Sequence, residues 1–220
     1  MAVYRLDDND IYLPEPTLAD DNGLLAVGGD LSVERLVLAY GNGIFPWFNE
    51  DSPILWWCPK KRFIIRPSKI HVSSSMKKFF RKHEVYIRIN RDFADTIHRC
   101  RTKRKTTWIT DDMEEAYIRM YENNLAVSVE SFIDGKLAGG LYGVCLGKCF
   151  FGESMFSDME NGSKAALIIF SKILEERNFL MIDCQFHTDH LESMGGEYIS
   201  WEEYREMLDS LKKYDPQENL

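Results

Sequence analysis

Residues 126–156, "AVSVESFIDGKLAGGLYGVCLGKCFFGESMF", encode three strands and two tight turns. The apolar and β-branched residues fall into three runs, 126–133, 136–147 and 148–156, and such runs are typical of strands. Asp134-Gly135 and Gly147-Lys148 separate the runs, and dipeptides of this kind favour the two-residue turns of β-hairpins. The stretch therefore predicts consecutive antiparallel hairpins.

Helical patterns lie on both sides of these hairpins. Residues 111–124, "DDMEEAYIRMYENN", repeat apolar side chains at helical spacing and carry acids in the first turn. After the hairpins, 162–178 predict a helix, "FLMIDCQF" (179–186) a strand and 200–211 a last helix. Helix, hairpins, helix and strand in this order predict the α+β class.

The first third of the chain predicts smaller elements. "DLSVERLVLAYGNG" (30–43) reads as a helix that begins at Asp30 or Ser32 and ends at Gly41 or Gly43. A proline-containing linker over 52–67 leads to an edge strand, followed by a helix over 73–83, a strand over 85–91 and a helix over 92–101. We expect a small N-terminal α+β domain, residues 1–62, and a larger domain, residues 63–220.

Composition narrows the class of protein. The longest apolar runs of the 220 residues fall far short of the roughly 20 that span a bilayer, and the N-terminus lacks a signal peptide's pattern. These features predict a soluble cytoplasmic protein. The five cysteines form no CxxC pair and no cluster with zinc spacing, so we expect free thiols. No metal and no organic cofactor is implied.

Positive charge is concentrated in one segment. The chain carries a net −8, yet residues 60–105 hold 16 Lys and Arg against three acids, a net +13. Two runs in this segment, "KKFFRKH" (77–83) and "RCRTKRK" (99–105), mix cations with aromatic or polar residues. Such runs suit contact with the phosphates of RNA, and Lys77, Lys78, Arg81 and Lys82 are the candidate contacts. The alternative is a solvated helix face.

A carboxylate and an amide stand two residues apart near the end of the predicted strand 179–186. In a strand, Asp183 and Gln185 share one face and Ile182, Cys184 and Phe186 share the other. Buried polar groups need partners, because an unpaired one costs on the order of 1–3 kcal/mol. The pair is therefore either a functional site or a structural hydrogen-bond pair.

Glu153 is a single acid within the apolar run "FFGESMFS". Acids in such places are rarely buried without a cationic partner. The partner is either an ammonium or guanidinium group of a substrate or a cation of the chain itself.

Eight motifs, in this order, resemble those of the leucyl/phenylalanyl-tRNA–protein transferases, over about residues 11–205. The motifs are "NGLLAVGGDLSVERLVLAYGNGIFPWF", "ILWWCP", "TWIT", "AYIRMYENNLAVSVE", "LAGGLYGV", "FFGESMFS", "GSKAAL" and "IDCQ". The resemblance implies transfer of Leu or Phe, with Met as a further donor, from tRNA to the α-amine of proteins that begin with Arg or Lys, which marks them for degradation. It also implies an acetyltransferase-like (GNAT-like) mixed-sheet fold for the second domain.

The resemblance assigns roles to individual residues. It implies that Leu141, Phe150 and Met155 line the pocket for the transferred side chain, although without it they read as core residues. The loops "FPWF" and "TWIT" favour Trp47 and Trp108 as stacking platforms for the terminal adenosine of tRNA, with core positions as the alternative.

For catalysis, the resemblance points to Asp183, Gln185 and Glu153. Asp183 would orient the amide of Gln185, which would then hold the attacking amine. Aminolysis of an ester needs little base strength because an α-amine has an ordinary pKa of about 7.7–8.0. The enzyme must mainly supply placement and stabilisation of the oxyanion. Proton transfer through the Asp/Gln pair and transfer assisted by the substrate both remain open.

Two other classes of protein are considered beside the transferase, and the chain differs from the family at one motif. An acyl-CoA-dependent acetyltransferase would need a pyrophosphate-binding loop, which "FSDMENGSK" lacks. An RNA-binding module without catalysis would explain the basic segment alone. The family commonly has Pro-Arg where this chain has Ser200 and Trp201, which leaves open what replaces the contact of that arginine. We expect a monomer with no membrane contact.

Overall fold

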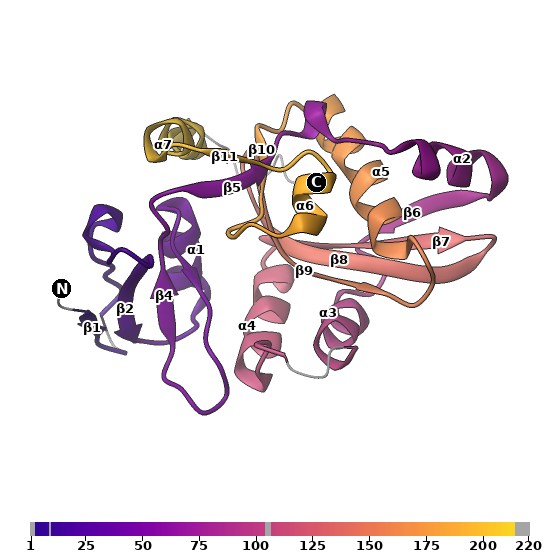
Figure 1. Ribbon diagram of the computed structural model, residues 1–220. Coiled ribbons are helices and arrows are strands. Elements are labelled where there is room, and N and C mark those ends of the chain that lie inside the picture. The colour runs from indigo at the N-terminus through magenta and orange to yellow at the C-terminus, as the bar shows by residue number, and fades with distance from the viewer. Residues whose placement is uncertain (1–2, 9, 104–106, 214–220) are drawn as a thin grey trace.

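The computed structural model describes residues 3–8, 10–103 and 107–213 (Figure 1). The chain forms two sheets and belongs to the α+β class, as predicted. Among the described residues, no helix is long and apolar enough to cross a membrane.

The first sheet is built from the N-terminal part of the chain and has the order β1-β2-β4-β3. Its strands are β1 (Tyr4–Leu6), β2 (Leu24–Gly28), β3 (Phe45–Pro46) and β4 (Leu55–Trp57), with a 3-10 helix η1 (Pro16–Leu18) between β1 and β2. Helix α1 (Val33–Gly41) follows β2, and the Ser32 side chain caps it by accepting a hydrogen bond from the Arg35 amide. One of the two predicted N-terminal caps is thereby confirmed.

The second sheet has seven strands in the order β11-β5-β10-β9-β8-β7-β6. Its strands are β5 (Arg62–Ile65), β6 (Val85–Ile89), β7 (Ala126–Ile133), β8 (Lys136–Leu146), β9 (Cys149–Ser157), β10 (Met181–Asp183) and β11 (Glu197–Ile199). β10 runs parallel to β9, and every other neighbouring pair is antiparallel. The hairpins β7–β8 and β8–β9 confirm the three predicted strands.

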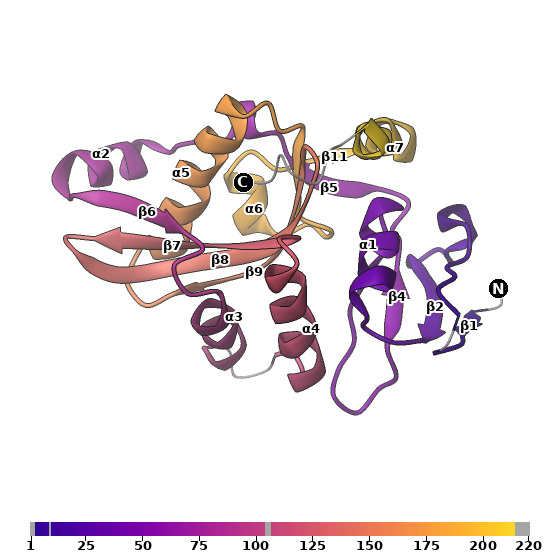
Figure 2. The ribbon, with the colours of Figure 1, turned by 180° about the vertical axis from the view of Figure 1, so that it is seen from behind.

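Helices cover both faces of the large sheet (Figures 1 and 2). One face carries α3 (Phe93–Thr102) and α4 (Asp111–Glu122), and the other carries α2 (Ser74–Lys82), α5 (Gly162–Glu176) and α6 (Asp189–Ser193). The N-terminal sheet lies beside the β11–β5 end, next to α7 (Trp201–Asp209). Two short 3-10 helices, η2 (Pro67–Lys69) and η3 (Ser210–Lys213), complete the described chain.

The buried side chains form two clusters, one on each face of the sheet. One cluster joins α3, α4 and the N-terminal sheet, and the other joins α5, α2 and the opposite face of β7–β10. All five cysteines, at positions 58, 100, 145, 149 and 184, are free thiols, as predicted.

The prediction of one strand over 179–186 is wrong. β10 ends at Asp183, and Gln185 has a left-handed backbone with a φ of 56°. Asp183 and Gln185 therefore do not share a strand face. The sequence pattern also does not reveal α6 and β11, because each contains only a few residues and lacks a clear period.

Candidate active site

A cavity of about 490 Å³ opens where the large sheet divides. β9 and β10 are paired only over 149–151 and 181–183, because β10 ends there while β9 continues to Ser157. Beyond this point the chain after β10 turns away from β9, and the second half of β9 forms one wall of the cavity. Residues 182–191 and the Phe45–Trp47 segment of the N-terminal sheet form other walls.

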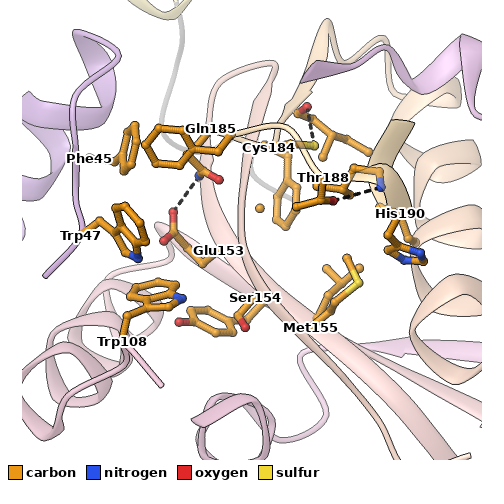
Figure 3. Close-up of a pocket in the computed structure, with 18 of the residues that line it drawn as sticks. Phe45, Trp47, Trp108, Glu153, Ser154, Met155, Cys184, Gln185, Thr188 and His190 are labelled. Atoms are coloured by element: carbon orange, nitrogen blue, oxygen red, sulfur yellow. Dashed lines mark hydrogen bonds between the residues drawn. The ribbon is translucent and has the colours of Figure 1, made fainter. Parts of the chain in front are cut away.

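The cavity brings together most of the site residues that the sequence predicts (Figure 3). They come from five separate segments of the chain, and they are Trp47, Trp108, Leu141, Phe150, Glu153, Met155 and Gln185. Asp183 and the four basic residues of α2 are not part of the lining. The walls are mainly apolar, so the few polar groups determine which chemistry is possible.

A β-bulge presents Glu153 to the cavity. Tyr142 pairs with Ser154 and Gly143 with Gly152, so Glu153 is the extra residue in β9. Bulges of this kind re-aim side chains near functional sites. Gly143 is required opposite the bulge because a Cβ there would lie 2.1 Å from the Phe151 carbonyl oxygen.

The Glu153 carboxyl group makes three hydrogen bonds within the chain. Tyr40 on α1 donates to Oε1 at 2.7 Å, Tyr117 on α4 donates to Oε2 at 3.0 Å, and the Gln185 amide donates to Oε1 at 3.2 Å. Burial raises the pKa of this carboxyl to about 7, although the two tyrosine hydrogen bonds act in the opposite direction. Among the residues that the structure describes, no cation forms an ion pair with Glu153, so the internal salt bridge considered from the sequence gains no support.

The side chain of Gln185 is held by Glu153 and its backbone by Asp183. Its Nε2 donates to Glu153, and its backbone N–H donates to Asp183 Oδ1 at 2.9 Å. The expectation that Asp183 orients the side-chain amide is therefore wrong. Because the NH₂ group donates to Glu153, the amide oxygen is left to accept a hydrogen bond from a ligand.

Asp183 is fully buried against Arg62. The Arg62 Nε lies 2.9 and 3.0 Å from the two carboxylate oxygens, and its Nη2 lies 2.8 Å from Oδ2. Tyr204 of α7 donates to the same Oδ2 at 2.7 Å. Asp183 thus holds together β5, α7 and the turn that carries Gln185. Arg62 also donates to the Gly43 carbonyl oxygen, which ties this cluster to the N-terminal part of the chain.

The two tryptophans flank Glu153 on the side of the N-terminal sheet (Figure 3). Trp47 is 41% exposed, so it is not a core residue, and its ring lies 5.3 Å from that of Phe186. Trp108 is partly buried against the core and also lines the cavity. Exposed aromatic faces beside a cavity suit the stacking of a base or a ribose.

The basic segment separates into free and neutralised parts. Lys77, Lys78, Arg81 and Lys82 are exposed on α2. By contrast, Arg99 and Lys103 pair with Asp158, and Arg101 pairs with Asp111 and Glu114. Arg104 and Lys105, which belong to the second predicted run, lie outside the described residues. Within the described part of the two runs, the free positive charge is thus concentrated on α2.

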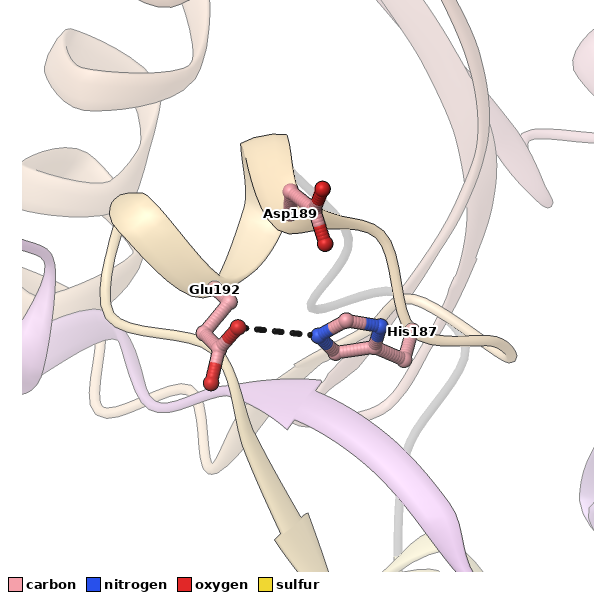
Figure 4. Close-up of side chains that lie close together, drawn as sticks. All are labelled: His187, Asp189 and Glu192. Atoms are coloured by element: carbon pink, nitrogen blue, oxygen red, sulfur yellow. Dashed lines mark hydrogen bonds and ion pairs between the residues drawn. The ribbon is translucent and has the colours of Figure 1, made fainter.

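Three possible metal ligands, His187, Asp189 and Glu192, lie together at the start of α6 (Figure 4). Their ligand atoms are within 4.8 Å of one another, and the His187 Nε2 lies 3.0 Å from a Glu192 oxygen. Asp189 and Glu192 are exposed. We interpret the cluster as a hydrogen-bonded His187–Glu192 pair on the surface with a neighbouring acid.

Sequence reasoning missed four residues that hold the site: Tyr40, Arg62, Tyr117 and Tyr204. The three tyrosines lie in elements whose apolar pattern explains them as core residues, and Arg62 is one of the 16 cations of the basic segment. Their hydroxyl and guanidinium groups meet Glu153 and Asp183 over separations of 21 to 121 residues, so no local signal could have identified them.

Comparisons with known proteins agree with this geometry. The sequence model of a family described as leucyl/phenylalanyl-tRNA protein transferase matches residues 64–209, and the model of its N-terminal domain matches residues 29–60. A relative from Desulfatibacillum aliphaticivorans is 49% identical, with 90% of this chain and 86% of the relative covered. Relatives from Syntrophus aciditrophicus (48%; 90% and 84% covered) and Syntrophobacter fumaroxidans (46%; 94% and 90% covered) are similar. All three are named leucyl/phenylalanyl-tRNA–protein transferase.

Proposed function

Because the chain belongs to the leucyl/phenylalanyl-tRNA–protein transferase family, we propose that it joins Leu or Phe from tRNA to proteins that begin with Arg or Lys. The chain is an aminoacyltransferase, and the resemblance seen in the sequence is confirmed. Both rival classes, the acyl-CoA-dependent acetyltransferase and the RNA-binding module without catalysis, are wrong. Methionine as a further donor and cytoplasmic location are part of the proposal.

The main support for the proposal is the set of residues that line the cavity. Apolar side chains line one part of it, two tryptophans lie at another, and Glu153 and Gln185 stand between them. An aminoacyl-adenosine has the matching order of groups: an apolar side chain, a reactive ester and an aromatic base. The ester would then lie beside Glu153 and Gln185.

We assign the roles accordingly. Leu141, Phe150 and Met155 contact the transferred side chain, and Trp47 and Trp108 stack on the terminal adenosine. Gln185 accepts a hydrogen bond from the attacking amine, and Glu153 handles protons and positive charge. Asp183 is a positioning residue, since it is enclosed and reaches the reaction only through Gln185.

The direct test combines the protein with leucyl-tRNA and a peptide that begins with Arg. We expect a new peptide bond between Leu and the Arg α-amine, detected by mass spectrometry. A matched peptide that begins with Glu is the acceptor control, and acetyl-CoA is the donor control. Equal modification of the Arg and Glu peptides would contradict the proposed acceptor class.

The first prediction from this proposal concerns salt. The four exposed cations of α2 would neutralise tRNA phosphates and release counterions, so donor binding should weaken steeply as salt rises. Replacing these four residues by Ala should make the slope of log affinity against log salt less steep. The slope should change by roughly 0.7–0.9 for each phosphate that is no longer neutralised. Filter binding of charged tRNA at several salt concentrations measures this slope.

The control for the salt prediction removes the same number of positive charges elsewhere. Lys136, Lys172, Arg177 and Arg205 are exposed and lie outside α2. Their replacement by Ala should leave most of the slope unchanged. An identical slope in the wild type and in the α2 variant would place the tRNA backbone on another surface.

The second prediction concerns the donor pocket. Leu141 is buried in the cavity wall, and its truncation leaves room beside the β-carbon of the donor side chain. We expect the wild type to disfavour valyl- and isoleucyl-tRNA through a clash at that carbon, because one methylene alone discriminates by only about 1–3 kcal/mol. Leu141→Ala should accept both donors, as measured by competition between charged tRNAs.

A second Leu→Ala variant serves as the control, because it lowers stability without changing the shape of the pocket. Leu174 on α5 is fully buried in the same core cluster but does not line the cavity. Leu174→Ala should destabilise the protein by about 2–5 kcal/mol, as buried Leu→Ala changes do, without changing donor choice. Equal use of Val, Ile and Leu donors by the wild type would contradict the pocket assignment.

We also propose that the chain divides into domains at about residue 62 and works as a monomer. The first sheet ends at Trp57 and the second begins at Arg62, which supports the boundary. Sedimentation at the enzyme's working concentration tests the oligomeric state.

A further inference from the structure

The hydroxyl groups of Tyr40 and Tyr117 and the carboxyl group of Glu153 form a closed ring. The Tyr40 oxygen lies 2.7 Å from Glu153 Oε1, the Tyr117 oxygen lies 3.0 Å from Oε2, and the two tyrosine oxygens lie 2.5 Å apart. All three separations fall in the range of O–H···O hydrogen bonds, and each such bond needs one proton between its oxygens. The ring therefore needs three protons.

The two tyrosines can supply only two of these protons, because a phenol carries one. Ionised Glu153 supplies none, which would leave one pair of oxygens in close contact without a proton. Protonated Glu153 supplies the third and completes the ring when its own O–H donates to Tyr117, which then donates to Tyr40, while Tyr40 donates to Oε1. The two rings are fully buried, so water is excluded from the tyrosine side of the site.

We propose that Glu153 works as a protonated acid in this ring, and that Tyr40 and Tyr117 are positioning residues that hold its proton for transfer to the departing ribose oxygen. The inference rests on the proposed function. In the reaction, the C–N bond to the acceptor amine forms and the C–O bond to the ribose breaks. One proton must move from nitrogen to the ribose oxygen. Glu153 donates its proton to that oxygen and receives one from the nitrogen, so the carboxyl group ends as it began.

Charged and titratable groups on every side of Glu153 enter this assignment. Besides the hydrogen-bonded neighbours Tyr40 on α1, Tyr117 on α4 and Gln185, they are Asp183 on β10 and Arg62 on β5. Burial raises the pKa of Glu153 to about 7, Asp183 acts in the same direction, and the two tyrosines and Arg62 act against it. Burial also raises the pKa of both tyrosines well above the usual value, so each hydroxyl keeps its proton.

The test reads the carboxyl group directly. Difference infrared spectra of the full chain, from about pH 5 to about pH 9, should show the carbonyl stretch of a protonated acid that disappears with a midpoint near 7. Glu153→Gln should lack the band. Tyr40→Phe and Tyr117→Phe should each shift the frequency of the band, because each removes a hydroxyl group that is hydrogen-bonded to the carboxyl group.

Single-turnover transfer from leucyl-tRNA completes the test. Each Tyr→Phe variant should be slower by about tenfold or more at saturating donor, with donor KM unchanged, and the double variant should be little slower than either. Tyr121→Phe is the matched control: it lies on α4, stacks on Phe93 and stays outside the ring. It should change neither the band nor the rate.

The outcomes separate the inference from the proposed function. A transferring wild type without a Glu153 band at any pH in this range would overturn the protonated ring. A band together with wild-type rates in both Tyr→Phe variants would overturn the positioning role. If the wild type transfers to no acceptor, the proposed function fails, whereas the infrared band still decides whether the ring holds a proton.

Discussion

Asp183→Asn should lower the free energy of unfolding by about 3–5 kcal/mol, because it leaves the buried Arg62 guanidinium without its counter-charge. The two side chains are both fully buried and are joined by three short N···O contacts. Asn has the same shape, so the loss comes from charge and not from packing. Urea unfolding followed by circular dichroism measures the change.

Two further variants make this prediction specific. Asp189→Asn, six residues away and exposed, should change stability by no more than about 0.5 kcal/mol. Arg62→Met combined with Asp183→Leu removes both charges and should be less destabilised than the sum of its single variants. A loss for Asp183→Asn as small as that for Asp189→Asn would show that the buried ion pair contributes little.

Transfer by Asp183→Asn separates the two roles considered for this residue. As a positioning residue, Asp183 acts by holding the Gln185 backbone, and Asn still offers an oxygen to that N–H. We therefore expect Asp183→Asn to lower the free energy of unfolding strongly. The transfer rate of the protein that remains folded should fall only weakly. A rate that falls about as far as that of Gln185→Ala, in folded protein, would instead favour direct contact with the amine.

Glu153→Gln should slow single-turnover transfer by about a hundredfold or more, because the amide has no proton to exchange with the substrate. The change keeps the side chain's size, and Gln can accept a hydrogen bond from one tyrosine through its oxygen and donate one to the other through its NH₂ group. Donor binding should therefore change little, and stability should fall by much less than in Asp183→Asn. Rapid-quench kinetics at saturating leucyl-tRNA measures the rate.

The pH dependence of the same reaction gives an independent check. Glu153 is neutral below its pKa of about 7 and ionised above it, so the fraction of enzyme with a transferable proton falls as pH rises through 7. The fraction of neutral acceptor amine rises over the same range. After division by that fraction, the wild-type rate should decline above pH about 7, and the Glu153→Gln rate should be flat. A Glu153→Gln enzyme with the wild-type rate and profile would mean that Glu153 does not transfer protons.

Much of the fold follows from local signals. The Asp134-Gly135 and Gly147-Lys148 turns and the alternation around them identified β7, β8 and β9 to within one residue at each end. The helical period did the same for α4 and α5 within two residues. These elements are long and periodic, so their own sequences specify them.

The sequence by itself also determined the family and named seven of the residues that line the cavity, since motifs mark the side chains that touch a ligand. Only the tertiary structure decided how those side chains are held. The Glu153 ring, the left-handed turn at Gln185 and the Arg62–Asp183 pair all depend on contacts between segments far apart in the chain. These contacts act through desolvation and through the number of protons that the hydrogen-bonded oxygens share. Both effects arise only after the chain has packed, so no pattern of neighbouring residues encodes them.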